Sequence, residues 1–165
     1  MRAIFLILCS VLLNGCLGMP ESVKPVSDFE LNNYLGKWYE VARLDHSFER
    51  GLSQVTAEYR ARNDGGISVL NRGYSEEKGE WKEAEGKAYF VNGSTDGYLK
   101  VSFFGPFYGS YVVFELDREN YSYAFVSGPN TEYLWLLSRT PTVERGILDK
   151  FIEMSKERGF DTNRL

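Results

Sequence analysis

Few side chains in this chain of 165 residues could carry catalysis. Its one histidine, His46, stands between Asp45 and Ser47, which are the residue types of a hydrolytic triad. Immediate sequence neighbours do not point at one another as a triad requires. The sequence has no cluster of metal-ligand residues, and its tyrosines give no specific signal for haem. We therefore expect a protein that is not an enzyme and that uses no cofactor and no metal.

The first sixteen residues decide the cysteine chemistry. Arg2 precedes an apolar stretch, Ala3 to Leu13, which has signal-peptide length and is too short to span a bilayer. It ends in Leu13-Asn14-Gly15-Cys16, which resembles the bacterial lipobox. The resemblance implies cleavage before Cys16, lipidation of Cys16, and delivery to the outer membrane, because Leu17 rather than aspartate follows. An ordinary secretory signal with a chance cysteine is the alternative.

The expected division of the chain follows from this motif. We expect a lipoprotein signal peptide at residues 1–15, a lipidated, extended tether at 16–27 and one folded domain at 28–165. Cys9 would leave with the signal peptide and Cys16 would carry lipid, so no disulfide is expected. The formal net charge of −4 comes without a basic run, which argues against a nucleic-acid partner.

Two clusters about a hundred residues apart frame the folded part, Gly36-Lys37-Trp38-Tyr39-Glu40 and Ser138-Arg139-Thr140-Pro141. An arginine stacked on a tryptophan contributes roughly 0.5–2 kcal/mol. Trp38 and Arg139 can meet if the first and last strands are neighbours, which requires the sheet to close on itself. The alternative is that Trp38 is simply a core tryptophan.

Stretches of alternating residues lie between the clusters, separated by turn-forming sequences such as Asp64-Gly65-Gly66 and Asn92-Gly93. This spacing predicts an all-β barrel or sandwich. The predicted strands cover residues 37–44, 53–62, 67–74, 81–91, 98–104, 110–117, 121–128 and 133–139.

A single convincing helical period follows the last strand. Ile147, Leu148, Phe151 and Ile152 recur on one face, with Thr142 as the N-cap and Gly159 as the C-terminal stop. One amphipathic helix after eight strands must pack its apolar side on the outside of the sheet.

Alternation along the strands assigns several small residues to the inward faces: Ala57, Ala61, Ala84, Gly86 and Ala88. A solid core would need bulky aliphatic side chains there, and an eight-stranded barrel is wide enough to hold one small ligand. We therefore expect an apolar cavity. The alternative is that facing aromatic side chains fill the space.

These residues resemble a known family. Gly36 to Arg43, Asp117 and Arg139 resemble the three signature regions of lipocalins, and blocks at 46–51, 85–90, 101–109 and 134–141 look typical of the bacterial outer-membrane branch. The resemblance covers residues 28–164. It implies an eight-stranded antiparallel up-and-down barrel with one C-terminal α-helix packed outside. Gly36, Trp38 and Arg139 would form the structural signature near the closed end, and the loop Asp45–Leu52 would frame the open end.

The resemblance also implies a function. Lipocalins bind small hydrophobic molecules, and the bacterial branch is associated with fatty acids and lysophospholipids in storage, transport or envelope maintenance. The expected partners are such a lipid and the membrane, which the chain would reach through an acyl anchor on Cys16. A homodimer is a further possibility. Carried over by strand position, the ligand-binding residues are Ala57, Tyr59, Val69, Asn71, Ala88, Phe90, Val101, Phe103, Tyr111, Val113, Tyr133 and Trp135.

Charged residues extend this expectation. The same register aims Glu115 inward near the closed end, where a buried carboxylate needs a partner or a raised pKa. Arg43, His46 and Arg50 are rim candidates for a phosphate or carboxylate head group, with ordinary solvated loop residues as the alternative. The alternative function, from another class, is that of a lipoprotein-assembly factor with an apolar half-barrel and an incompletely closed sheet.

Overall fold

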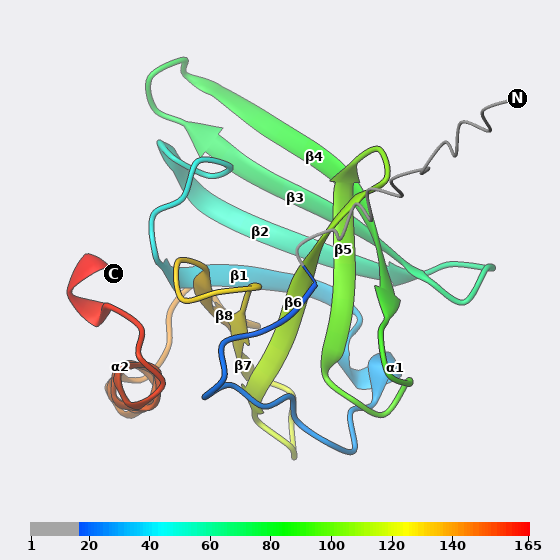
Figure 1. Ribbon diagram of the computed structural model, residues 1–165. Helices are drawn as coiled ribbons and strands as arrows, with labels where there is room; N and C mark the ends of the chain where they lie inside the picture. The colour runs from blue at the N-terminus through cyan, green and yellow to red at the C-terminus, as the bar shows by residue number, and fades with distance from the viewer. Residues whose placement is uncertain (1–16) are drawn as a thin grey trace, which may run out of the picture.

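The computed structural model describes residues 17–165, so the predicted signal peptide and Cys16 lie outside the described residues. Eight antiparallel strands pair in sequence order, and β1 also pairs with β8, which closes the sheet into a barrel (Figure 1). This confirms the predicted barrel and contradicts the open sheet expected of an assembly factor. The elements are α1 (Leu31–Tyr34), β1 (Gly36–Arg43), β2 (Leu52–Ala61), β3 (Ile67–Ser75), β4 (Glu80–Phe90), β5 (Tyr98–Phe104), β6 (Phe107–Leu116), β7 (Tyr123–Ser127), β8 (Leu134–Ser138), α2 (Arg145–Glu157) and the 3₁₀-helix η1 (Thr162–Arg164).

The up-and-down order divides the connections between the two ends of the barrel. The β2–β3, β4–β5 and β6–β7 connections lie at the end where β1 begins, with α1 immediately before it. We call this the closed end. The β1–β2, β3–β4, β5–β6 and β7–β8 connections lie at the opposite end, which we call the open end.

Trp38 and Arg139 meet at the closed end, as predicted. The Arg139 guanidinium carbon lies 3.9 Å from the centroid of the fully buried Trp38 ring. The same guanidinium donates hydrogen bonds to the carbonyl oxygens of Asn33, Lys37 and Tyr121 at 2.8, 2.9 and 3.2 Å. It therefore ties the segment around α1, the first strand and the β6–β7 connection to the end of β8. Gly36 enters β1 at a φ of +96°, a conformation that favours glycine.

Helix α2 covers part of the outer wall, as predicted. Phe151 is fully buried against Phe125, and Leu134 and Leu136 of β8 lie in the same outer core. The predicted N-cap at Thr142 is wrong, because the helix begins at Arg145 with Glu144 as its N-cap. Ile152 is partly exposed and does not join this core.

Helix α2 ends just before a glycine with a positive φ. Gly159 has a φ of +84° just beyond the C-cap Arg158, which confirms the predicted stop. No helix within residues 17–165 combines the length and apolar character needed to cross a bilayer.

Glu115 points out of the barrel, so its predicted inward position is wrong. Val113 pairs with Val126, but Glu115 pairs with Phe125, and the pairing register shifts between these two positions. This bulge adds one residue to β6 and reverses the inward–outward alternation beyond it. Lys150 of α2 donates a hydrogen bond to Glu115 Oε1 at 2.7 Å. The carboxylate therefore has its partner on the outer wall.

Residues 17–27 pack against the barrel, whereas the sequence predicts an extended tether. Val23 is buried in the outer core, and Val26 is buried among the side chains of the barrel interior. The Val26 N–H donates to the Val113 carbonyl at 2.8 Å, and Ser22 Oγ donates to the Arg158 carbonyl at 2.7 Å. Valine side chains next to the proline residues give this segment enough apolar surface to hold its place.

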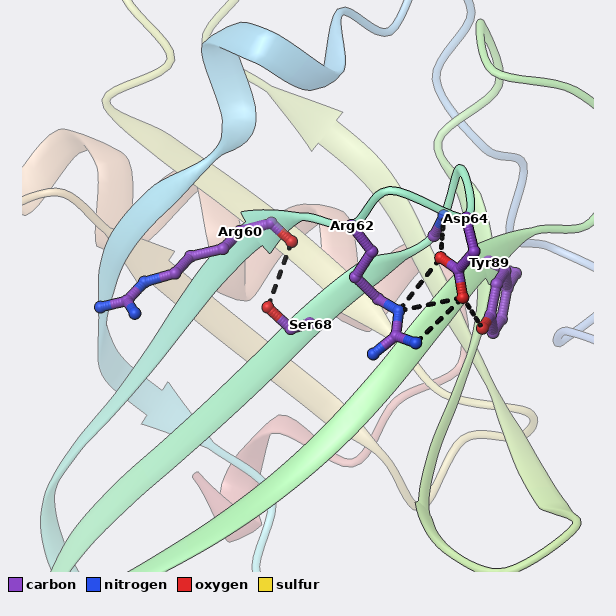
Figure 2. A network of polar contacts seen from close by, with 6 residues as sticks. Arg60, Arg62, Asp64, Ser68 and Tyr89 are labelled. Atoms are coloured by element: carbon purple, nitrogen blue, oxygen red, sulfur yellow. Dashed lines mark hydrogen bonds and ion pairs between the residues drawn. The ribbon is translucent and has the colours of Figure 1, made fainter.

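A polar network pins the β2–β3 turn to β4 at the closed end (Figure 2). The Arg62 guanidinium donates to both carboxylate oxygens of Asp64, and the Tyr89 hydroxyl of β4 donates to Asp64 Oδ2 at 3.0 Å. Arg62, followed by the Gly66 N–H, holds the pKa of Asp64 well below its usual range. The network is solvent-exposed, so it shapes the turn and has no part in the barrel interior.

Candidate functional site

A cavity of about 110 Å³ lies inside the barrel. Carbon atoms dominate its wall, with a few polar groups among them. Its lining residues are Glu40, Glu49, Val55, Ala57, Tyr59, Val69, Asn71, Ala88, Val101, Phe103, Ser110, Tyr111, Trp135 and Leu137. Drug-sized ligands occupy roughly 300–1,000 Å³. A long acyl chain therefore requires lining side chains to move, and the half-exposed Phe103 ring at the open end is the clearest candidate.

The structure places nine of the twelve predicted ligand-binding residues on the cavity wall. The nine are Ala57, Tyr59, Val69, Asn71, Ala88, Val101, Phe103, Tyr111 and Trp135. The other three lie elsewhere. Phe90 packs edge-on against Phe29 near the closed end, and Val113 is fully buried in the solid core there. Tyr133 precedes β8 and stacks on Phe48 and Trp135 at the open end.

The sequence prediction missed five lining residues: Glu40, Glu49, Val55, Ser110 and Leu137. Three of them carried a signal, and Val55 is one, because it lies two residues before Ala57 on the same strand. Glu40 is two residues after Trp38 and Leu137 is two residues after Trp135, so strand alternation alone points both inward. Glu49 carried none, because it lies in the loop between β1 and β2.

Glu40, Arg43, His46 and Glu49 form a buried polar cluster at the cavity wall. Arg43 Nη1 lies 2.6 Å from Glu40 Oε1, and Arg43 Nη2 donates to the carbonyls of Glu49 and Leu52. His46 Nε2 lies 2.8 Å from Glu49 Oε2, and the Trp135 indole N–H donates to the same oxygen at 3.0 Å. The cluster folds the β1–β2 loop back over the barrel interior.

The pKa values of the two carboxyl groups, Glu40 and Glu49, shift in opposite directions. Burial, followed by the negative charge of Glu49, raises the pKa of Glu40 to about 8. Burial also disfavours the charge on Glu49, but hydrogen bonds from His46 and Trp135 hold the pKa of Glu49 below its ordinary value. At neutral pH the cavity therefore faces one neutral carboxyl group and one carboxylate.

The three residues predicted to bind a head group are occupied by other contacts. Arg43 and His46 are held by the cluster just described, and Arg50 Nε donates to Asp45 Oδ2 at 2.8 Å outside the cavity. Each of the three already has a carboxyl partner: Glu40 for Arg43, Glu49 for His46 and Asp45 for Arg50. They do not form an unoccupied anion site.

Glu40→Gln is expected to flatten the dependence of stability on pH. In the parent, folding raises the Glu40 pKa from 4.5 to about 8, so the folded state binds more protons than the unfolded state between these values. The contribution of Glu40 to the stability of the folded state is therefore fully present below about pH 4.5 and is lost as pH rises towards 8. Glutamine has no proton to lose. Urea unfolding across this window measures the effect, and a variant that keeps the parent's slope would contradict a raised pKa of Glu40 in the folded state.

Three tyrosine hydroxyls meet where the cavity approaches the closed end. The Tyr111 hydroxyl lies 2.6 Å from that of Tyr34 and 2.9 Å from that of Tyr59. Burial raises the pKa of all three hydroxyls, so they remain neutral donors and acceptors. Trp38 Nε1 donates to the Tyr34 carbonyl at 2.8 Å, which links the three tyrosines to the Trp38–Arg139 stack at the closed end.

Asn71 supplies a buried acceptor without a partner. Its Oδ1 is buried on the cavity side of β3 and has no hydrogen-bond partner among the described residues. The residues opposite it are Ala57 on β2 and Ala84 on β4, whose methyl groups cannot donate. An unpaired buried carbonyl costs about 1–3 kcal/mol, so a ligand with an O–H or N–H group would relieve that cost.

Comparisons with known proteins agree with this architecture. A family model described as a lipocalin-like domain matches residues 29–165. The outer membrane lipoprotein Blc of Vibrio cholerae serotype O1 is 99% identical over 165 residues, which cover 100% of this chain and 96% of that protein. The outer membrane lipoprotein Blc of Escherichia coli K12 is 51% identical over 145 residues, covering 88% of this chain and 81% of that protein.

A solved structure supports the fold independently. Insecticyanin from the tobacco hornworm Manduca sexta superposes with a TM-score of 0.70 at 23% identity, covering 89% of this chain and 84% of the other. The identity to outer membrane lipoproteins, over 100% of this chain for the Vibrio protein and 88% for the Escherichia coli protein, places the protein at the outer membrane. The closed barrel, the Trp38–Arg139 stack and these matches together show that the chain belongs to the lipocalin family.

Proposed function

We propose that this lipocalin is a membrane-anchored binding protein that holds the acyl chain of a lysophospholipid or fatty acid inside its barrel. The observation that carries the proposal is the largely apolar cavity in a closed barrel. Alanine residues on β2 and β4 leave this space open. Cys16 would carry the lipid anchor, and a Cys16→Ala variant should then be recovered from the soluble fraction.

The polar part of the wall favours a lysophospholipid over a fatty acid. Glu49 presents a carboxylate to the cavity, and Arg43 is already held by Glu40 and by two backbone carbonyls. A fatty-acid carboxylate would meet a like charge there, which is destabilising at short range. The glycerol hydroxyl of a lysophospholipid can instead donate to Asn71 Oδ1.

Competition at neutral pH tests the proposal. The protein is loaded with a fluorescent fatty acid, and unlabelled lysophospholipid and fatty acid are added in parallel. We expect both to displace the probe, and lysophospholipid to do so at the lower concentration. Displacement by neither would contradict binding in the barrel, whereas fatty acid as the better competitor would contradict the role given to Glu49 and Asn71.

Asn71→Leu is expected to separate the two ligands. Leucine removes the unpaired carbonyl, so the free protein should gain about 1 kcal/mol of stability. The affinity for lysophospholipid should fall severalfold, because one hydrogen bond is lost, while the affinity for fatty acid should not fall. Isothermal titration with each ligand measures the difference, and the fatty acid is the internal control. Equal losses for both ligands would contradict a specific contact with the hydroxyl group.

A further inference from the structure

Large exposed hydrophobic side chains gather at the open end of the barrel. Within the described residues, Phe48, Trp81, Phe103, Phe104 and Phe107 all keep large exposed fractions, and all lie in or next to open-end connections. The closed-end connections, at 62–66, 91–97 and 117–122, contribute no exposed large hydrophobic residue. Apolar surface concentrated in this way marks an interaction surface.

The most exposed part is the phenylalanine tip, by which we mean Phe104 and Phe107. These residues pair with each other across the turn between β5 and β6, and they are 80% and 62% exposed. The chain from Val101 to Phe114 contains no charged residue. Aromatic side chains without nearby charge suit the interface of a lipid bilayer.

The first described residues, Leu17 and Gly18, lie beside the strand that carries this tip. The Gly18 N–H donates a hydrogen bond to Ser110 Oγ at 2.9 Å. Ser110 stands three residues after Phe107 on β6, a separation of about 10 Å along a strand. Two residues of chain span at most about 7 Å, so a lipid on Cys16 would be attached within about that distance of Gly18.

Residues 17–27 pack against the barrel, which restricts how the barrel can turn relative to a lipid anchor on Cys16. Val23 and Val26 are buried, and the Val26 backbone is bonded to Val113 of β6. A bilayer that accepts the acyl chains therefore meets the phenylalanine tip, and not the charged closed-end turn Asp117-Arg118-Glu119-Asn120. This is why a lipid surface fits the tip better than a protein partner or a second copy of the chain.

The tip also adjoins the cavity. Phe103, the residue before Phe104, lines the cavity and is 41% exposed. A contact between the tip and the bilayer would therefore bring the open end of the cavity to the membrane surface. The β3–β4 turn at the open end, Glu76-Glu77-Lys78-Gly79, is charged, so the barrel would have to tilt onto its β5–β6 side.

We propose that the phenylalanine tip inserts into the bilayer interface beside the Cys16 anchor, with the barrel opening towards the membrane. Lipid would then pass between bilayer and cavity without crossing water. The orientation rests on lipidation of Cys16, and the passage of lipid rests on the proposed function.

Site-specific quenching tests the orientation on the mature, lipidated chain reconstituted into phosphatidylethanolamine and phosphatidylglycerol vesicles. Cys16 is the only cysteine after the signal peptide and its thiol would carry lipid, so Phe104→Cys provides a single site for an environment-sensitive fluorophore. Nitroxide lipids should quench most of this emission. Matched labels at Glu119→Cys, in the closed-end turn, and at Lys78→Cys, in the charged open-end turn, should stay bright.

Two results would overturn the orientation. One is a Phe104→Cys label that nitroxide lipid does not quench, and the other is equal quenching at Glu119→Cys. Energy transfer between differently labelled copies, observed together with no quenching of the tip by nitroxide lipid, would assign the tip to a dimer. That result would also overturn the proposal.

The combined variant Phe104→Ser with Phe107→Ser tests the passage of lipid. We expect transfer of fluorescent lysophospholipid from vesicles to slow severalfold, with unchanged affinity in vesicle-free titrations, because neither residue lines the cavity. An unchanged transfer rate would overturn direct passage. Quenching at the tip without any lipid binding would leave the orientation standing and overturn the proposed function, so the two failures are distinguishable.

Discussion

Ala57→Trp is expected to abolish binding of acyl ligands while the barrel remains folded. Ala57 lines the cavity on β2 and is only partly buried, so an indole can enter the cavity without displacing a closely packed neighbour. The cavity measures about 110 Å³, and an indole group would take up most of it. Titration with a fluorescent fatty acid should lose its saturable signal, while circular dichroism keeps the strand signature of the parent.

A matched variant separates blocking from a general effect of tryptophan. Ala61 lies four residues further along the same strand and is exposed beyond the cavity. Ala61→Trp should therefore bind ligand as the parent does. Parent-like affinity in Ala57→Trp would mean that the ligand does not occupy the barrel.

Arg139→Ala is expected to lower the free energy of unfolding by about 2–4 kcal/mol, with little effect on ligand affinity. The change removes a cation–π contact and three hydrogen bonds to backbone carbonyls, and charge-assisted bonds of this kind contribute about 1.5–3 kcal/mol each before solvent exposure weakens them. The cavity wall does not include Arg139. Urea unfolding and ligand titration of the same preparation measure both quantities.

Two further variants show which property of Arg139 matters. Arg139→Lys keeps the charge but cannot reach three carbonyls with a planar fork, so it should recover only part of the lost stability. Arg62→Ala removes an arginine from the solvent-exposed network at the β2–β3 turn and should cost much less. A similar loss from Arg62→Ala would contradict a special role for the Trp38–Arg139 stack.

The strands and most of the cavity wall were predictable because both depend on local periodicity. In a regular strand, the side of Ala57, Tyr59, Val69 and Val101 follows from counting by two, and the structure places all four on the cavity wall. The contact between Trp38 and Arg139 was predictable because a closed sheet makes the first and last strands neighbours.

Prediction failed where one extra residue or a non-local contact decided the position. The bulge in β6 turned Glu115 outward to Lys150, and no residue type in β6 signals that bulge. Glu49 reaches the cavity because its loop folds back onto Trp135, which lies 86 positions away in the sequence. Phe90 and Val113 point inward but lie in the part of the barrel that side chains fill.

Strand alternation and residue size in the sequence were enough to predict the class of the fold and the pairing of its two ends. They also identified Ala57 and Ala88 as small residues of the cavity wall, whereas Ala61, Ala84 and Gly86 lie outside it. Only the folded chain shows that Glu49 faces the cavity and Glu115 does not, that the pKa values of Glu40 and Glu49 shift in opposite directions, and where residues 17–27 pack. These depend on the bulge, on burial and on the distances between groups far apart in the chain. The catalytic-looking Asp45-His46-Ser47 shows the difference, because His46 is held by Glu49 rather than by either neighbour.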